Sequence, residues 1–441
     1  MTQPTAAESG PSAPRRLGGI LLAPGYLPRH ALIYLYAAFI TVGLFAFVSF
    51  FQAYLLNVNL GLRADVQGRT VAVLLFANEL VALWLVAPFG ALADKVGRRA
   101  VYALGLLWVG ASFLVYPLAS TLLQLTVCSM IYSVGAAAIG TMLGTVLADT
   151  PAEGSRGKLV GVAGFCQGLG AAVLVLVLGH VPKWLHEGGM EIREAGAVAL
   201  WLAAALCVAS ALVVFLGLKR GTPSTSAPAL PLRRILAEGL AAARGNPRLW
   251  FAYLLQFGSF GDRVVIGTFL SLRLQQAWLG QGVDMTEAAH RASLPFIVAM
   301  MAGLVTALVV GLMLDRVDRL RVGVLAMALA ALSYLLGGWI DDPTQRLPML
   351  AIAALLGIGQ IAAIIAGQTL LGEEAPRDVR GAVFGVAGMF GSVAILFTLA
   401  FGGWLYDSVS QGGPFFLLAA VNFGIFLFGL RLLRKKVSRD R

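Results

Sequence analysis

The sequence GALADKVGRR, residues 90–99, lies between two long apolar stretches, and a related sequence, GLMLDRVDR, occupies residues 311–319. A second pair of matching segments begins at residues 156 and 380, at nearly the same spacing. Two motifs that recur in register and in the same order predict two related halves with parallel topology. The matching positions are Gly90, Asp94 and Arg98 with Gly311, Asp315 and Arg319, and Arg156, Gly157, Gly161 and Gly164 with Arg380, Gly381, Gly385 and Gly388.

The composition predicts a membrane protein, because 59% of the 441 residues are apolar and 12% are charged, whereas an average soluble domain has about 25% charged residues. Twelve stretches are long enough to cross a hydrocarbon core of roughly 30 Å, and in lipid each must be a helix. We therefore predict an all-α membrane fold of twelve transmembrane helices in two pseudo-symmetric six-helix bundles. The stretches are 31–56, 71–93, 100–118, 122–147, 159–181, 195–218, 249–272, 294–314, 322–340, 347–371, 382–405 and 414–433.

The positions of the basic residues predict the orientation of the chain. With the N-terminus inside, 25 of the 33 Lys and Arg residues fall in segments on the cytoplasmic side, and such a bias places both termini in the cytoplasm. The predicted organisation is a cytoplasmic tail (1–30), a first bundle (31–218), a linker (219–248), a second bundle (249–433) and a basic cytoplasmic tail (434–441).

The linker carries Leu232, Ile235, Leu236 and Leu240 at helical spacing beside basic residues. This pattern is typical of an amphipathic helix on the anionic inner leaflet. The alternative is a tether with no role beyond its length.

The loop after the second stretch resembles the signature loop of the major facilitator superfamily, a family of twelve-helix transporters. Six residues fill the signature in the first half, whereas the second copy has Asp318 where a glycine would stand. The resemblance implies a cytoplasmic gate: Asp94 would face the start of span 11 near Arg380, and Asp315 the start of span 5 near Arg156. The signature residues are Gly90, Asp94, Lys95, Gly97, Arg98 and Arg99, with Gly311, Asp315, Arg316 and Arg319 in the second copy.

Within each half, the same resemblance implies that Arg98 pairs with Asp149, and Arg319 with Glu373 or Glu374. Independently of the family, Gly90 would let two helices approach closely, and Asp94 could accept hydrogen bonds from the amino end of a neighbouring helix. The alternative is that these charges merely orient the loops.

Three ionisable residues lie deep within predicted spans: Glu79 in span 2, and Asp262 and Arg263 in span 7. Charges at bilayer depth cost at least about 2.5 kcal/mol each, so they are candidates for function. We predict that Arg263 pairs with Glu79 across the two halves and that Asp262 lines the cavity as a substrate-binding or proton-carrying carboxylate. The alternative is one static cluster that locks the halves together.

The family resemblance implies that spans 1, 4, 7 and 10 line the cavity. Their larger polar side chains are Gln52, Tyr132, Gln256, Gln360 and Gln368, and the two span 10 glutamines are the better candidates, because a buried amide needs partners. The chain lacks the Gly-Pro pair of span 5 and the span 4 arginine of proton-linked drug antiporters.

The predicted function is secondary active transport of a small organic solute by alternating access, coupled to protons. Alternatives are a facilitative uniporter, an efflux carrier of amphiphilic compounds, and a non-transporting sensor on the same scaffold. The four scattered histidines and three cysteines within apolar runs predict no metal and no cofactor, and the loops predict no enzyme. We expect a monomer in the cell inner membrane that contacts lipid, solute and protons, and no nucleic acid.

Overall fold

Twelve membrane-spanning segments make up the protein, in a computed structural model that describes residues 15–152, 155–221, 232–314, 317–376 and 378–439. Eleven of the segments are single helices long and apolar enough to cross a membrane. The first six spans are α1 (Pro28–Val58), α2 (Ala64–Val96), α3 (Arg98–Val115), α4 (Leu122–Asp149), α5 (Arg156–Glu187) and α6 (Ile192–Gly217). The second six are α8 (Pro247–Val264) with its continuation, α10 (Met285–Leu314), α11 (Arg319–Trp339), α12 (Arg346–Glu374), α13 (Arg380–Ser408) and α14 (Gly413–Arg439).

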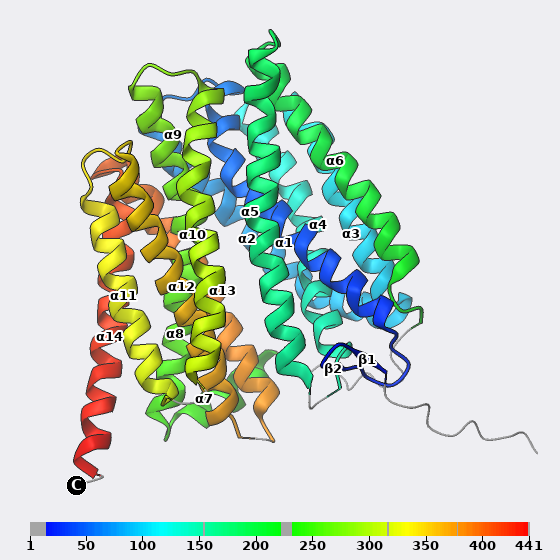
Figure 1. The fold of residues 1–441 in the computed structure, drawn as a ribbon, viewed down its shortest axis with the longest axis vertical. Coiled ribbons are helices and arrows are strands. Elements are labelled where there is room, and N and C mark those ends of the chain that lie inside the picture. Colours follow the sequence, from blue (N-terminus) through cyan, green and yellow to red (C-terminus); the bar gives the residue numbers. More distant parts are fainter. Residues whose placement is uncertain (1–14, 153–154, 222–231, 315–316, 377, 440–441) are drawn as a thin grey trace, which may run out of the picture.

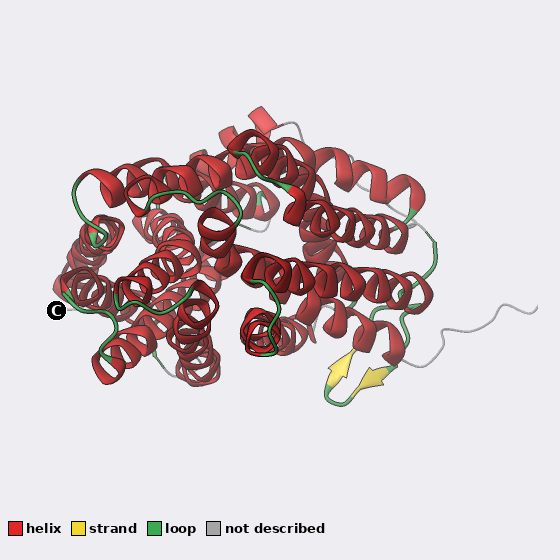
Figure 2. Cartoon of the chain, turned by 90° about the horizontal axis from the view of Figure 1, so that it is seen from above, coloured by secondary structure: helices red, strands yellow, loops and turns green. Residues whose placement is uncertain are grey.

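The two halves repeat one packing pattern in the same sense. In the first half α1 packs on α5, α2 on α4, and α3 on both α4 and α6; in the second half α8 packs on α13, α10 on α12, and α11 on both α12 and α14. The two bundles lie side by side when viewed along the helices (Figure 2). The parallel repeat predicted from the paired motifs is therefore present in the fold.

Span 7 is not a regular helix. α8 is followed without a break by a π-helical segment, η3 (Val265–Leu270), and by α9 (Ser271–Gly280). A π-helix widens the backbone spiral and is frequently found at functional sites. Here the π-helix begins two residues after Arg263. The apolar pattern of the sequence did not indicate this irregularity.

The end of the bundle that carries the α2–α3 turn, α7 and the N-terminal hairpin is called the inner end below, and the opposite end the outer end (Figure 1). The α2–α3 turn is a single residue, Gly97, with φ of +96°. Residues other than glycine rarely adopt this backbone conformation. At the corresponding turn of the second half, Asp318 has φ of −54° and its carboxylate accepts a hydrogen bond from the Leu320 amide, 2.9 Å, at the start of α11. The degenerate second motif thus replaces a glycine turn with a helix cap.

The linker contains the helix α7 (Leu232–Ala243), which packs mainly along α13 and not against lipid alone. The Tyr253 hydroxyl donates to the Gly239 carbonyl over 2.9 Å, and Ala243 is fully buried. The linker helix is therefore partly built into the second bundle.

A short hairpin precedes α1: β1 (Arg16–Leu17) pairs with β2 (Ile20–Leu21). It is tied to the α4–α5 loop, where the Leu21 amide donates to Ser155 Oγ over 2.9 Å and Leu22 pairs with Pro151. The segment before the first span is thus in part an ordered strap on the inner end.

Candidate transport pathway

The two halves are joined by polar contacts at the outer end. Asp407 of α13 accepts hydrogen bonds from the backbone amides of Gly68, 3.0 Å, and Arg69, 2.6 Å, near the amino end of α2. A negative charge in the last turn of a helix is unfavourable, because the helix dipole is already negative there. The amino end of α2, which is positive, lies across the interface and compensates for this cost.

Other outer contacts between the halves reinforce this closure. Lys183 of α5 lies 2.8 Å from Glu287 of α10, and Gln276 of α9 donates to the Gln67 side chain over 2.9 Å. Below them an apolar cluster combines both halves, with Phe50, Ala53, Ala72 and Val175 packed among residues of α9, η3 and α10. Most of the hydrogen bonds and ion pairs between described residues of the two halves lie in this outer part. Farther along α2, the Glu79 carboxyl accepts a hydrogen bond from the Ser392 hydroxyl of α13.

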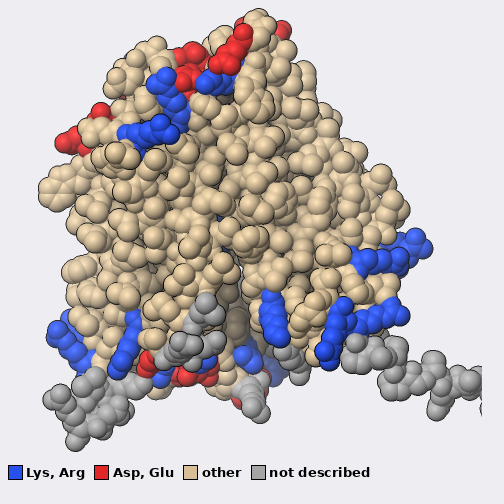
Figure 3. Space-filling model, in the orientation of Figure 1, with Lys and Arg blue, Asp and Glu red and all other residues tan. Residues whose placement is uncertain are grey.

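The inner parts of the halves lie apart. The space-filling view is hollowed between the halves at its basic inner end (Figure 3). Most glycines of the two repeated motifs have no neighbouring protein atom within 4 Å of the position that a Cβ would take: Gly90, Gly157, Gly161, Gly164, Gly311, Gly381 and Gly388. The exceptions are Gly97, next to Gly221, and Gly385, next to Ile235 of α7. The close approach predicted for Gly90 is therefore not made in this conformation, which is open at the inner end.

The first-half motif forms a network within its own half. Arg98 contacts Asp94, and its Nε lies 3.1 Å from Asp149 Oδ2. Asp94 has no hydrogen bond or ion pair with Arg380, whose Nη2 instead donates to the Gly372 carbonyl over 3.0 Å. The predicted contact between Asp94 and the start of α13 is thus absent while the inner end is open. Lys95 is exposed, and Arg99 stacks on Phe215 at 4.7 Å.

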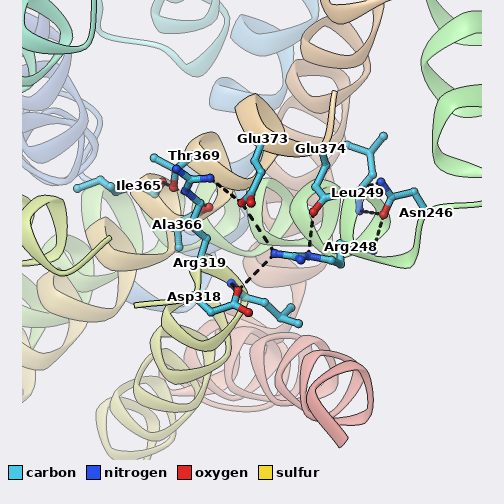
Figure 4. A network of polar contacts seen from close by, with 11 residues as sticks. Asn246, Arg248, Leu249, Asp318, Arg319, Ile365, Ala366, Thr369, Glu373 and Glu374 are labelled. Atoms are coloured by element: carbon cyan, nitrogen blue, oxygen red, sulfur yellow. Dashed lines mark hydrogen bonds and ion pairs between the residues drawn. The ribbon is translucent and has the colours of Figure 1, made fainter. Parts of the chain in front are cut away.

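The second-half network is larger (Figure 4). Arg319 Nη1 lies 2.7 Å from Glu373 Oε2, and Arg248 Nε lies 2.8 Å from Glu374 Oε1. Arg248 also contacts Asp318 and Glu373 at 3.3 and 3.8 Å. Arg248 is the centre of this network, and it was missed because it precedes span 7 by one residue and belongs to neither motif. Asp315, Arg316 and the Arg156 side chain, which were predicted gate residues, lie outside the described part of the chain.

Glu79 and Arg263 face one another across the halves, although they form no ion pair within 4.0 Å. The Glu79 carboxyl is half-buried and lies beside the Ser392 hydroxyl of α13, and Arg263 is the opposite charge that acts on it. The Arg263 side chain is exposed, and its guanidinium lies 4.7 Å from the centre of the Phe260 ring. The two charges act on one another, but the predicted direct ion pair is not formed in this conformation.

The prediction that Asp262 lines the cavity is wrong. Its side chain is completely buried inside the second bundle, and Asn422 of α14 donates to Asp262 Oδ1 over 2.8 Å. Because adjacent residues on a helix point about 100° apart, exposing Arg263 turns Asp262 inward. Asn422 was overlooked, yet an amide within the apolar stretch 414–433 was a usable signal.

The polar side chains predicted for the cavity are mostly inside the bundles. Gln52, Tyr132, Gln256 and Gln360 are each less than 7% exposed, whereas Gln368 of α12 is exposed. Of the predicted residues, Arg263 and Gln368 are therefore exposed and Glu79 is half-buried. Among the described residues, no group of three His, Cys, Asp or Glu side chains could hold a metal ion.

Two parallel six-helix bundles, closed at one end and open at the other around a polar centre, define the class of membrane transport proteins that work by alternating access. The sequence profile of the Major Facilitator Superfamily matches residues 33–289 and 252–441. The chain belongs to this superfamily.

Curated relatives and solved structures agree with this assignment. The chain is 27% identical to magnetosome protein MamH of Paramagnetospirillum magneticum, over 93% of the chain and 94% of that protein. It is 24% identical to magnetosome protein MamZ of the same organism, over 88% of the chain and 60% of MamZ. The fold is similar to that of the nucleoside transporter NupG, with a TM-score of 0.69 and 14% identity over 91% of this chain and 99% of that one.

A second solved structure with a similar fold is a POT family transporter in complex with 5-aminolevulinic acid, with a TM-score of 0.69 and 14% identity over 93% of this chain and 98% of that one. A bacterial homologue of the lysosomal transporter Spinster, solved in an inward-facing conformation, has a TM-score of 0.60 and 16% identity over 92% of this chain and 96% of that one.

Proposed function

We propose that the protein is a secondary active transporter that moves a small organic solute by alternating access and couples its movement to protons. The observation that carries the proposal is the division of the interface between the two halves: polar contacts join them at the outer end, and at the inner end the surface between them is hollowed. Glu79 and Arg263, one from each half, act on one another within the membrane-spanning part.

Glu79 is the proposed proton carrier. It is half-buried, comes from the opposite half to Arg263, and lies in the interface that must rearrange when the open end changes. A carboxyl in this position can be neutralised by Arg263 or by a proton, and a switch between these two states is what coupling requires. Asp262, enclosed by Asn422 within one bundle, is assigned to holding α8 and α14 together.

The inner end is proposed to face the cytoplasm, because it carries most of the basic residues. The cell inner membrane is the proposed location. Because the relatives MamH and MamZ are named magnetosome proteins, the magnetosome membrane is a second proposed location. Fractionation of cells that express a tagged chain separates the two.

The proposed function is tested with protein reconstituted in liposomes and screened for solute uptake under an imposed pH gradient. Glu79→Gln should abolish accumulation driven by the gradient and retain solute exchange without it. Glu191→Gln, which removes an exposed carboxylate at the outer end, is the matched control and should behave as the parent. Full gradient-driven accumulation by Glu79→Gln would refute the coupling site.

A further inference from the structure

Arg263, in the last turn of α8, carries a charge within a membrane-spanning segment. Its exposed guanidinium packs on the Phe260 ring at 4.7 Å, and it has no hydrogen bond or ion pair to any residue that the structure describes. Arg273, which follows on α9, is 7% exposed and donates to the Gly337 and Ile340 carbonyls, each over 2.5 Å. Arg273 therefore has a structural role at the end of α11, whereas Arg263 is free to bind something else.

No carboxylate that the structure describes forms a direct ion pair with Arg263 in this conformation, although the Glu79 charge acts on it from a distance. Asp262, its neighbour in the chain, is turned into the second bundle and held by Asn422. Glu79 is farther than 4.0 Å and lies beside Ser392. An arginine at this depth is costly without a partner, so a group that enters the open space is the remaining means of pairing it.

We propose that Arg263 is the anion-binding group of the solute site, so that the transported solute is an organic anion with a carboxylate or phosphate group. This inference rests on the proposed function and adds the chemical class of the solute. The planar guanidinium forms paired hydrogen bonds with either anion. Its flank, Phe260, offers an apolar face to the organic part of the solute, and the basic inner end attracts anions into the opening.

The proposal also gives the solute a place in the coupling. A solute anion that occupies Arg263 removes the only opposite charge acting on Glu79 that the structure describes. The Glu79 carboxylate is then left in a half-buried site without a counter-ion, which favours its protonation. Solute and proton would therefore bind together and move in the same direction.

The electrostatic part of the proposal can be tested before any solute is known. Cys128, Cys166 and Cys207 are replaced by alanine, and Gly388→Cys is introduced as a reporter on α13. Gly388 faces open space, one turn from Gly391, which packs against Phe260. The reporter is labelled with the anionic sulfonatoethyl and the cationic trimethylammonium-ethyl methanethiosulfonates, and the two rates are normalised to those of a free thiol.

The normalised rate ratio should favour the anionic reagent, and Arg263→Gln should lower the ratio at least about fivefold, as expected for one charge removed nearby at an effective dielectric constant of about 20. Arg263→Lys, which keeps the charge, should preserve the ratio. A reporter at Gly157, at the inner end of α5 in the other half, should respond far less. A ratio at Gly388 that is unchanged by Arg263→Gln, or that favours the cationic reagent, would overturn the proposal.

A second measurement uses the unmodified protein and so does not depend on folding of the variants. Thermal stability is measured with paired probes that differ in charge, benzoate against benzamide and succinate against succinamide. Stabilisation by a carboxylate and not by its amide supports the proposal, and stabilisation by the amides alone contradicts it. If the anion effects are present while gradient-driven uptake is absent, the anion site stands and the proposed proton coupling fails.

Discussion

Asp407→Asn is the most informative perturbation of the outer closure. The Asp407 carboxylate accepts two backbone hydrogen bonds, 3.0 and 2.6 Å long, from Gly68 and Arg69 in the other half. Asparagine keeps one acceptor oxygen and loses the charge that complements the amino end of α2. Because a hydrogen bond to a charged group contributes about 1.5 to 3 kcal/mol and Asp407 is only half-buried, we expect a loss of about 1 to 2 kcal/mol. The ratio of outward-open to inward-open molecules should rise roughly 5- to 30-fold.

The assay is labelling of a cysteine that only outward opening exposes. Ala53 is 4% exposed and belongs to the apolar cluster below the outer contacts, so Ala53→Cys in a background without other cysteines is the reporter. A membrane-impermeant maleimide added from the outer side should react 5- to 30-fold faster in the Asp407→Asn protein.

The matched control is Asp342→Asn, which removes an outer carboxylate whose hydrogen bonds stay within its own loop, at Thr344. It should leave the labelling rate unchanged. Equal labelling of the parent and Asp407→Asn proteins would refute the assignment of Asp407 to the outer closure.

Three further predictions follow from single contacts. Lys183→Gln and Glu287→Gln should each speed the same labelling, and the double variant should add little, because both single changes remove one ion pair of 2.8 Å; additive effects would argue against the pair. Gly97→Ala should lower the stability of the protein by about 1 to 3 kcal/mol, since an alanine at φ of +96° is strained, and an unchanged melting temperature would contradict this. The pKa of Tyr26 is raised to about 12, mainly by burial and also by the nearby Asp149 charge, so the neutral phenol is favoured in the folded strap. Its stabilising contribution should be complete below pH 10 and be lost as the pH rises towards 12, and Tyr26→Phe should remove this dependence in limited proteolysis of the N-terminal segment.

The number of spans and the parallel repeat could be predicted because apolar length and repeated motifs are local properties of the sequence. Arg319 with Glu373 and Arg98 with Asp149 could be predicted from the resemblance, since each pair joins two helices of the same half and does not depend on which end is open. Contacts between the two halves could not be predicted in this way, because they depend on which end of the protein is open. The absent contact between Asp94 and Arg380 is the clearest example.

The main error of the sequence prediction was the rotational orientation of span 7, which turns Asp262 into the second bundle and leaves Arg263 exposed. The sequence places Asp262 and Arg263 side by side, and nothing local says which of two adjacent residues points into the bundle. That choice is made by Asn422, 160 positions away, which offers Asp262 a buried hydrogen bond, and by the Phe260 ring beside Arg263. The outer residues Asp407, Lys183 and Glu287 were missed because polar side chains near span ends are normally ordinary surface residues.

The central claim, that the open end alternates, is tested most directly by measuring both ends of the molecule at once. Spin labels at Glu191 and Asp341 report on the outer end, and labels at Arg220 and Arg244 on the inner end; all four residues are exposed. In the parent protein the inner pair should be widely separated, and the Asp407→Asn change should shorten the inner distance while lengthening the outer one. Two distances that stay fixed, or that lengthen together, in protein that transports solute would contradict alternating access by these two bundles.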